Sequence, residues 1–221
     1  MVEEFGDDFS EELVPLEFTK RKAAREDIRE VEIRYIFATA TVPKTFVTVT
    51  YRVNAYGKIK VYLDYKGNES LPDLPAFGLQ FVTAEKQEGY SWDGLSGETY
   101  PDRYKGASFG SYESATCMTP YLVPQECGNH KDTYRMKVGE LIFLMSERPF
   151  NFSVLPYTQH QIAAVYHQEE LPESFRSVIR ILGALRGVGG IDSWGSDVEK
   201  AYHIKGKNDI RFSFYMLPVL S

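Results

Sequence analysis

The sequence predicts an all-β fold, an antiparallel sandwich with one or two short helices. Residues 47–53 alternate strictly between apolar and polar side chains, the period of a half-buried strand. Further short apolar runs are separated by Gly and Pro, which is typical of antiparallel sandwiches and not of repeated strand–helix–strand units. At 221 residues the chain is long enough to bury a real core.

A β-hairpin is the clearest local prediction. Ile59, Val61, Leu63 and Tyr65 repeat the alternation of residues 47–53, and Asn54–Gly57 supplies a turn between the two runs. Two more alternating runs, residues 77–81 and residues 210–216, predict further strands.

Two segments favour helices. Thr158 followed by Gln161 fits a capping box, in which each side chain satisfies the other residue's backbone N–H at a helix start. Thr19–Glu30 is rich in Lys, Arg, Ala and Glu, which favours a helix with a solvated face. We therefore expect a charged, partly helical segment at residues 1–30 and one sandwich domain at residues 31–221.

Charge and cysteine content limit the classes of binding partner and the cellular compartment that we expect. A net charge of −6 argues against nucleic acid or an anionic membrane as a partner, since both attract basic surfaces. The acidic N-terminus lacks the layout of a signal peptide, and no apolar run approaches the roughly 18 residues of a membrane span. Cys117 and Cys127 are expected to be reduced thiols, so a cytoplasmic protein is predicted.

No standalone catalytic motif is present, neither a nucleophile elbow, nor a phosphate loop, nor a dinucleotide fingerprint. His160 and His167 are seven residues apart and offer at most two metal ligands on one face. His130, His160, His167 and His203 are interpreted as polar surface or as satisfied core residues.

The segment Tyr100-Pro101-Asp102-Arg103 favours a structural role. Pro101 fixes a turn, and adjacent opposite charges can lock a loop through hydrogen bonds. Asp102 is also a candidate acid or base, but no second carboxylate is identifiable beside it, and glycoside hydrolysis needs a pair at a set separation.

The segment Gly187–Gly195 is the most suggestive loop. Its glycines predict a loosely constrained backbone, and Trp194 sits among Asp192, Ser193 and Ser196 instead of apolar neighbours. An indole in such a place is either a flat platform for a ligand, such as the C–H face of a sugar, or a packed anchor of the loop.

Five motifs in order resemble the small-chain domain of family 2 β-galactosidases. Glu98-Thr99-Tyr100-Pro101-Asp102-Arg103 resembles the family's Glu-Asn-Tyr-Pro-Asp-Arg segment, and Gly187–Gly195 resembles its Gly-x-Gly-Gly-x-Asp-Ser-Trp-Gly loop. Between them lie three further matches: Thr119–Asn129, which contains Pro124, Gln125 and Glu126; Phe152–Tyr157; and His167–Leu171.

The resemblance implies a large antiparallel supersandwich like that of galactose mutarotases, and a non-catalytic job. The family's acid and nucleophile are glutamates on a separate TIM-barrel domain or large subunit, which also holds magnesium. Trp194, with Asp192 and Ser193, matches the loop that contacts the β-galactoside, for example lactose. Tyr100, Pro101, Asp102 and Arg103, with Pro124, Gln125 and Glu126, match structural motifs of the family.

Two departures from the family pattern concern single residues. Asp93-Gly94-Leu95-Ser96-Gly97 lacks the family's Gly-Arg-Gly-Pro, and Cys127 replaces an asparagine, so interactions made by those family residues are not expected here. A second hypothesis is a free-standing mutarotase-like enzyme or carbohydrate-binding module on the same sandwich. A mutarotase needs an acid and a base beside the sugar ring, and none of the four histidines lies in a recognisable mutarotase motif.

Overall fold

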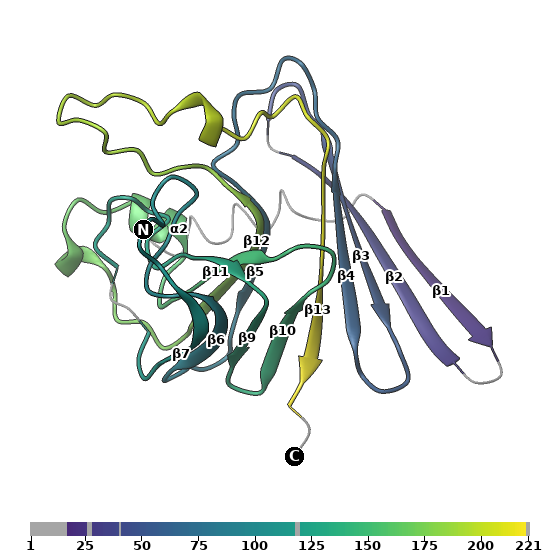
Figure 1. Ribbon diagram of the computed structural model, residues 1–221. Helices are drawn as coiled ribbons and strands as arrows, with labels where there is room; N and C mark the ends of the chain where they lie inside the picture. Colours follow the sequence, from purple (N-terminus) through teal and green to yellow (C-terminus); the bar gives the residue numbers. More distant parts are fainter. Residues whose placement is uncertain (1–16, 26–27, 40, 118–119, 220–221) are drawn as a thin grey trace. The chain divides into compact units, whose positions relative to one another are not determined.

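A computed structural model describes residues 17–25, 28–39, 41–117 and 120–219 (Figure 1). The chain divides into two compact units. Leu74–Ile204 forms the second unit, and the described residues on either side of it form the first. Nearly all regular structure is antiparallel β, which confirms the predicted fold class.

The first unit is a run of five antiparallel strands in the order β1, β2, β3, β4, β13. Each strand pairs residue for residue with its neighbour in that order. The bounds are β1 Glu17–Arg25, β2 Ile28–Ala38, β3 Phe46–Val53, β4 Ile59–Tyr65 and β13 Ile210–Pro218. The strand predicted at residues 210–216 is therefore confirmed as part of β13.

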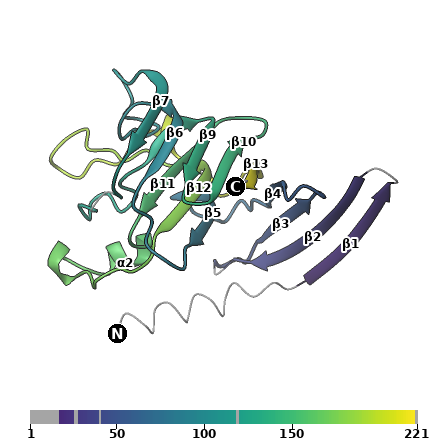
Figure 2. The same cartoon turned by 90° about the horizontal axis from the view of Figure 1, so that it is seen from below.

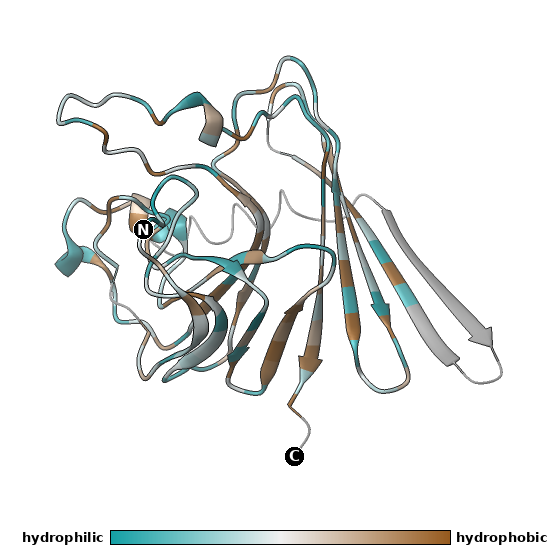
Figure 3. Cartoon of the chain, in the orientation of Figure 1, coloured by the Kyte–Doolittle hydropathy of each residue, from teal (hydrophilic) through white to brown (hydrophobic). Residues whose placement is uncertain are grey.

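Strands β3 and β4 confirm the predicted hairpin. Val49 lies opposite Leu63, and both are buried. The Asn54 side-chain carbonyl accepts the backbone N–H groups of Tyr56 and Lys58, each at 3.0 Å. Gly57 completes the turn with φ +77°, a left-handed conformation that glycine adopts without a steric penalty. The alternation of apolar and polar residues along β3 and β4 is visible in Figure 3.

The helix predicted over Thr19–Glu30 is wrong. Within that stretch the described residues belong to β1 and the start of β2, and all of β1 pairs with residues 28–36 of β2. Residues 28–36 contain Val31, Ile33 and Tyr35 at strand spacing, so β2 has a strong strand pattern. Lys, Arg and Ala favour a helix by only a small free energy per residue, and pairing with this strand outweighs that preference. The domain boundary at residue 30 stays a prediction.

The second unit contains two sets of four antiparallel strands (Figure 2). One has the order β10, β9, β6, β7 and the other has the order β5, β12, β11, β8. The bounds are β5 Ala76–Val82, β6 Tyr90–Leu95, β7 Phe109–Ser114, β8 His130–Thr133, β9 Arg135–Val138, β10 Leu141–Met145, β11 Phe150–Leu155 and β12 Val178–Leu185. Strand β5 confirms the prediction for residues 77–81.

Aromatic rings join the two sets of strands into a sandwich. Tyr90 and Trp92 of β6 meet Phe152 of β11, with ring centroids 5.6 Å and 6.0 Å apart. Phe81 of β5 meets Phe143 of β10 at 5.6 Å. Such rings bury much apolar surface and dominate the energetics of a core.

A short helix follows β11. Helix α2, Gln159–Ala163, begins at the predicted capping box, because the Thr158 hydroxyl accepts the Gln161 N–H and the Gln161 side chain accepts the Thr158 N–H. Its Ile162 packs on Leu155 and the buried, unbridged Cys127. Two 3₁₀ turns, η1 Gln168–Glu170 and η2 Lys200–Tyr202, complete the regular elements of the described residues.

His130 lies within the sandwich as a neutral, hydrogen-bonded ring. Its centroid is 4.2 Å from that of Trp92 and 4.7 Å from that of Phe152. Its Nδ1 is 2.8 Å from the Gly97 carbonyl oxygen and its Nε2 is 3.0 Å from the Tyr90 hydroxyl. In the neutral ring, Nδ1–H donates to Gly97 and Nε2 accepts from Tyr90. Burial lowers the pKa of His130 from its ordinary 6.5 to about 4.

Acidification should therefore destabilise the protein through His130. Between pH 6.5 and about 4 the unfolded chain binds this proton and the folded chain does not, so the free energy of unfolding falls as the pH drops through that window. The loss from this group approaches about 3 kcal/mol and ends below pH 4. Urea unfolding at pH 7 and pH 4.5 should show a smaller drop for His130→Gln than for the wild type. An equal drop in both proteins would contradict this role.

Candidate functional site

The candidate site is the long connection from β12 to η2, residues 186–199, which extends away from the strands of its unit (Figure 1). Trp194 lies in it with 92% of its surface exposed. By contrast, Trp92 is 5% exposed and donates its indole N–H to the Leu95 carbonyl at 2.9 Å. Trp194 is therefore no part of a packed interior in this chain.

Asp192 shapes the part of the loop around Trp194. One carboxylate oxygen accepts the backbone N–H of Trp194 at 2.9 Å and that of Ser196 at 3.2 Å, and the other accepts the Ser196 hydroxyl. These donors, the hydroxyl first, hold the pKa of the Asp192 carboxyl below its ordinary value. Ser193 is exposed between Asp192 and Trp194. Asp192 thus acts in this chain as a local brace of the loop backbone.

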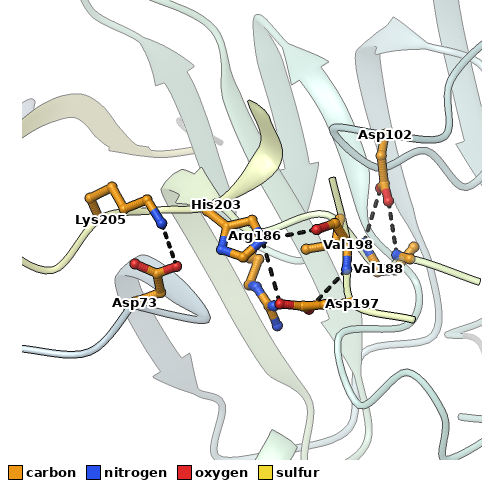
Figure 4. Close-up of polar contacts among 9 residues, drawn as sticks. Asp73, Asp102, Arg186, Val188, Asp197, Val198, His203 and Lys205 are labelled. Atoms are coloured by element: carbon orange, nitrogen blue, oxygen red, sulfur yellow. Dashed lines mark hydrogen bonds and ion pairs between the residues drawn. The ribbon is translucent and has the colours of Figure 1, made fainter. Parts of the chain in front are cut away.

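The stem of the loop is held by Asp102 and Arg103. The two Asp102 carboxylate oxygens accept the consecutive N–H groups of Val188 at 3.0 Å and Gly189 at 2.8 Å (Figure 4). Arg103 donates from Nε to the Gly189 carbonyl at 2.9 Å and from Nη2 to the Gly190 carbonyl at 2.8 Å. Two motifs about 86 residues apart in the chain therefore meet here.

The prediction of a loosely constrained loop backbone is wrong at this stem. A Cβ on Gly187 would lie 2.8 Å from Asp102 Cγ and 2.5 Å from Val198 Cγ2, so glycine permits a close approach there. Gly189 and Gly190 have φ of +73° and +70°, a left-handed backbone conformation that residues with a side chain rarely adopt. Here the glycines allow one particular conformation that hydrogen bonds then fix.

The segment of the loop that follows Trp194 is held by a second cluster of polar residues, shown in Figure 4. Asp197 forms an ion pair with Arg186 and accepts the Val198 N–H at 2.8 Å. His203 places Nε2 2.9 Å from the Val198 carbonyl and 3.6 Å from Asp197 Oδ2. The N–H of Val198 and then the charge of Arg186 hold the pKa of Asp197 below its ordinary value.

Tyr100 links Asp102 and Arg103, the two residues of the clamp on the loop stem, to the sandwich. Its ring packs against Leu182 and Leu185 of β12, just before the loop begins. The backbones of Tyr100 and Arg103 exchange two hydrogen bonds, of 2.8 Å and 3.0 Å, which close the turn at Pro101 and Asp102. The hydroxyls of Tyr100 and Tyr121 both donate to Glu98. Burial, followed by this carboxylate, raises the pKa of both hydroxyls, that of Tyr121 to about 12.

The residues Pro124, Gln125 and Glu126 lie outside this clamp. Glu126 forms an ion pair with Arg180 of β12, with side chains only 19% and 10% exposed. Pro124 is half-buried after a cis peptide bond, and Gln125 is exposed. The structure therefore places this motif against the middle of β12, whereas Asp102 and Arg103 act beyond its end.

Sequence reasoning missed Arg186, Asp197 and His203. The signal was weak, because an acid and a base on either side of a glycine loop have no fixed spacing. The interpretation of the histidines as core or surface residues is confirmed for His130, which is buried, and for His160 and His167, which are exposed.

The described residues contain no group of three His, Cys, Asp or Glu side chains arranged to hold a metal ion. Within the same residues, no helix has the length and apolarity needed to cross a membrane.

Comparison with known proteins gives one consistent result. A family profile described as beta galactosidase small chain matches residues 4–216. The beta-galactosidase small subunit of Latilactobacillus sakei is 46% identical over 210 residues, which cover 88% of this chain and 66% of that protein. The beta-galactosidases of Streptococcus thermophilus and Lactobacillus delbrueckii subsp. bulgaricus are each 35% identical over 197 residues.

The alignments to the latter two cover 86% of this chain but only 19% of their length. The chain thus spans 66% of the first relative and a much smaller part of the other two. The resemblance inferred from five ordered motifs is confirmed, and the alternative of a free-standing mutarotase-like enzyme or carbohydrate-binding module is not favoured. This chain belongs to the β-galactosidase small-chain family.

Proposed function

We propose that this chain is the non-catalytic small subunit or C-terminal domain of a β-galactosidase and completes the sugar site of a catalytic partner. One observation carries the proposal: an indole that is 92% exposed stands on a loop whose backbone is held by charged hydrogen bonds. Sugars have apolar C–H faces that stack on such rings, and an exposed tryptophan on a fixed support suits that contact.

In the proposed enzyme the catalytic groups and the sugar-stacking loop lie on two different polypeptides or domains. A glutamate acid and a glutamate nucleophile on a TIM-barrel partner flank the glycosidic bond, and that partner also holds magnesium. Trp194 covers one face of the β-galactoside, such as lactose, with Asp192 and Ser193 beside it on the substrate-binding loop. Because stacking acts on the bound sugar and not on the charges that develop as the bond breaks, it contributes to affinity more than to turnover.

The proposed setting is the cytoplasm, without nucleic acid or membrane as a partner. Cys117 and Cys127 are unbridged, which suits a reducing compartment. The net charge of −6 is unfavourable for binding polyanions.

The chain alone should not hydrolyse a chromogenic β-galactoside, and activity should appear when its catalytic partner is added. The reason is that the acid and the nucleophile lie on the partner. Initial rates with the chain alone, the partner alone and the two mixed test this directly.

We also expect galactose to bind the isolated chain more weakly than about 1 mM, because one stacking face gives about 1 kcal/mol before ordering costs.

Two outcomes would contradict the proposal. One is turnover by the purified chain that disappears when one of its own carboxylates is replaced. The other is full activity of the partner with no change on adding this chain. His130→Gln, whose change is confined to the sandwich interior, serves as a matched control that should still restore activity at neutral pH.

A further inference from the structure

We propose that Asp102 and Arg103 are positioning residues, which set the place of Trp194 by fixing the stem of its loop. This inference rests on the proposed function, in which Trp194 contacts the sugar. It adds a role for two residues that act on the backbone of the loop and, as proposed, do not contact the substrate.

The contacts of Asp102 are of the strong kind. Both of its oxygens are used, on the consecutive N–H groups of Val188 and Gly189, at 3.0 Å and 2.8 Å. Hydrogen bonds to an ionised carboxylate are stronger than those between neutral groups. Two bonds from one rigid carboxylate fix the direction of the backbone as well as its position.

Arg103 holds the same part of the backbone as a hydrogen-bond donor, whereas Asp102 holds it as an acceptor. The Gly189 N–H donates to Asp102, and the Gly189 carbonyl accepts from Arg103 Nε at 2.9 Å. The Gly190 carbonyl accepts from Arg103 Nη2 at 2.8 Å. Neighbouring side chains therefore hold both backbone groups of Gly189. The planar, forked guanidinium suits this task better than an ammonium group.

Further contacts carry the constraint toward Trp194. Only Ile191, Asp192 and Ser193 separate Gly190 from the indole, and Asp192 braces that stretch by accepting the Trp194 N–H at 2.9 Å. On the returning side, Asp197 and His203 hold Val198. Polar contacts therefore fix the loop before Trp194, at Trp194 and after it, while the Trp194 side chain stays exposed. A platform fixed before binding avoids the entropy cost of ordering it with the sugar.

The first test uses the chain alone and does not depend on the proposed function. Asp102→Asn keeps the volume but removes the charge and one acceptor, so at least one of the Val188 and Gly189 amides should exchange hydrogen tenfold faster or more. With fluorotryptophan in place of tryptophan, the Trp194 fluorine signal should change in position or width while that of Trp92 stays unchanged. The matched control is Asp73→Asn, which removes a carboxylate that pairs with Lys205 at 2.8 Å (Figure 4).

The second test uses the assembled enzyme. Asp102→Asn and Arg103→Ala should raise KM for lactose about three- to fivefold with kcat nearly unchanged, and Arg103→Lys should recover part of the loss. A defect in folding would instead lower the amount of active enzyme and leave KM unchanged. Should Asp102→Asn fold poorly, the pair Arg103→Ala and Arg103→Lys carries the test.

The results separate this inference from the proposed function. Unchanged exchange of both amides and an unchanged Trp194 signal in Asp102→Asn would overturn the positioning role, whatever the enzyme does. A raised KM in Trp194→Ala with a normal KM in Asp102→Asn and Arg103→Ala would also overturn it and leave the function intact. A normal KM in Trp194→Ala, with the amide exchange altered as expected in Asp102→Asn, would refute the sugar contact and keep the clamp.

Discussion

Trp194→Ala should raise KM of the assembled β-galactosidase for lactose about fivefold, the loss of roughly 1 kcal/mol of binding, and leave the melting temperature of the chain unchanged. The indole is 92% exposed, so its removal creates no cavity. It should also weaken transfer to acceptor sugars, since stacking acts on the bound ligand and not on the charges that develop as the bond breaks. Trp194→Phe should recover part of the loss because a smaller ring keeps a face.

The matched control is the other tryptophan. Trp92 is buried against Tyr112, with ring centroids 5.4 Å apart, and against His130. Trp92→Ala should lower the free energy of unfolding by roughly 3–5 kcal/mol, as large-to-small changes in a core do. If Trp194→Ala lowered the melting temperature as far as Trp92→Ala and left KM normal, Trp194 would be a packing residue.

Glu126→Ala should lower the free energy of unfolding by roughly 3 kcal/mol, the lower end for breaking a buried ion pair. Arg180 lies within β12 with its side chain 10% exposed, so loss of Glu126 leaves a positive charge with little access to water. Urea unfolding at pH 7 measures the change. Glu69→Ala, which removes an exposed partner of Lys207, should leave the unfolding midpoint unchanged.

The double change Glu126→Leu with Arg180→Met distinguishes a charge effect from a packing effect. Replacing both members of a buried pair by apolar residues is often neutral, so the double variant should be more stable than Glu126→Ala. Equal instability of the two variants would show that the segment around Glu126 is sensitive to any change, and would contradict the ion-pair account.

Local patterns in the sequence were sufficient for part of the fold. The hairpin of β3 and β4 and the capping box of α2 depend on neighbours within a few residues, and both are present. The helix prediction for Thr19–Glu30 is wrong for the opposite reason. Its own composition favours a helix, but β1 forms by pairing with a strand whose pattern is stronger.

In the candidate site, too, the sequence predicts local features but not long-range contacts. Trp194, Asp102 and Arg103 were identifiable as unusual residues, but their connection was not, because about 86 residues separate the carboxylate from the amides it holds. The glycine pattern by itself predicts a loose backbone, because a sequence does not show where side chains approach a backbone closely. Gly187 is instead required by the Asp102 and Val198 side chains beside it.

Trp194 is proposed to contact the sugar in the assembled enzyme. Fluorotryptophan placed in this chain alone, followed by assembly with an unlabelled catalytic partner, gives two fluorine signals. Titration with a non-hydrolysable thio-β-galactoside should shift the Trp194 signal in parallel with inhibition and leave the Trp92 signal in place. A Trp194 signal that stays unchanged while the enzyme becomes saturated with the thiogalactoside would contradict the account.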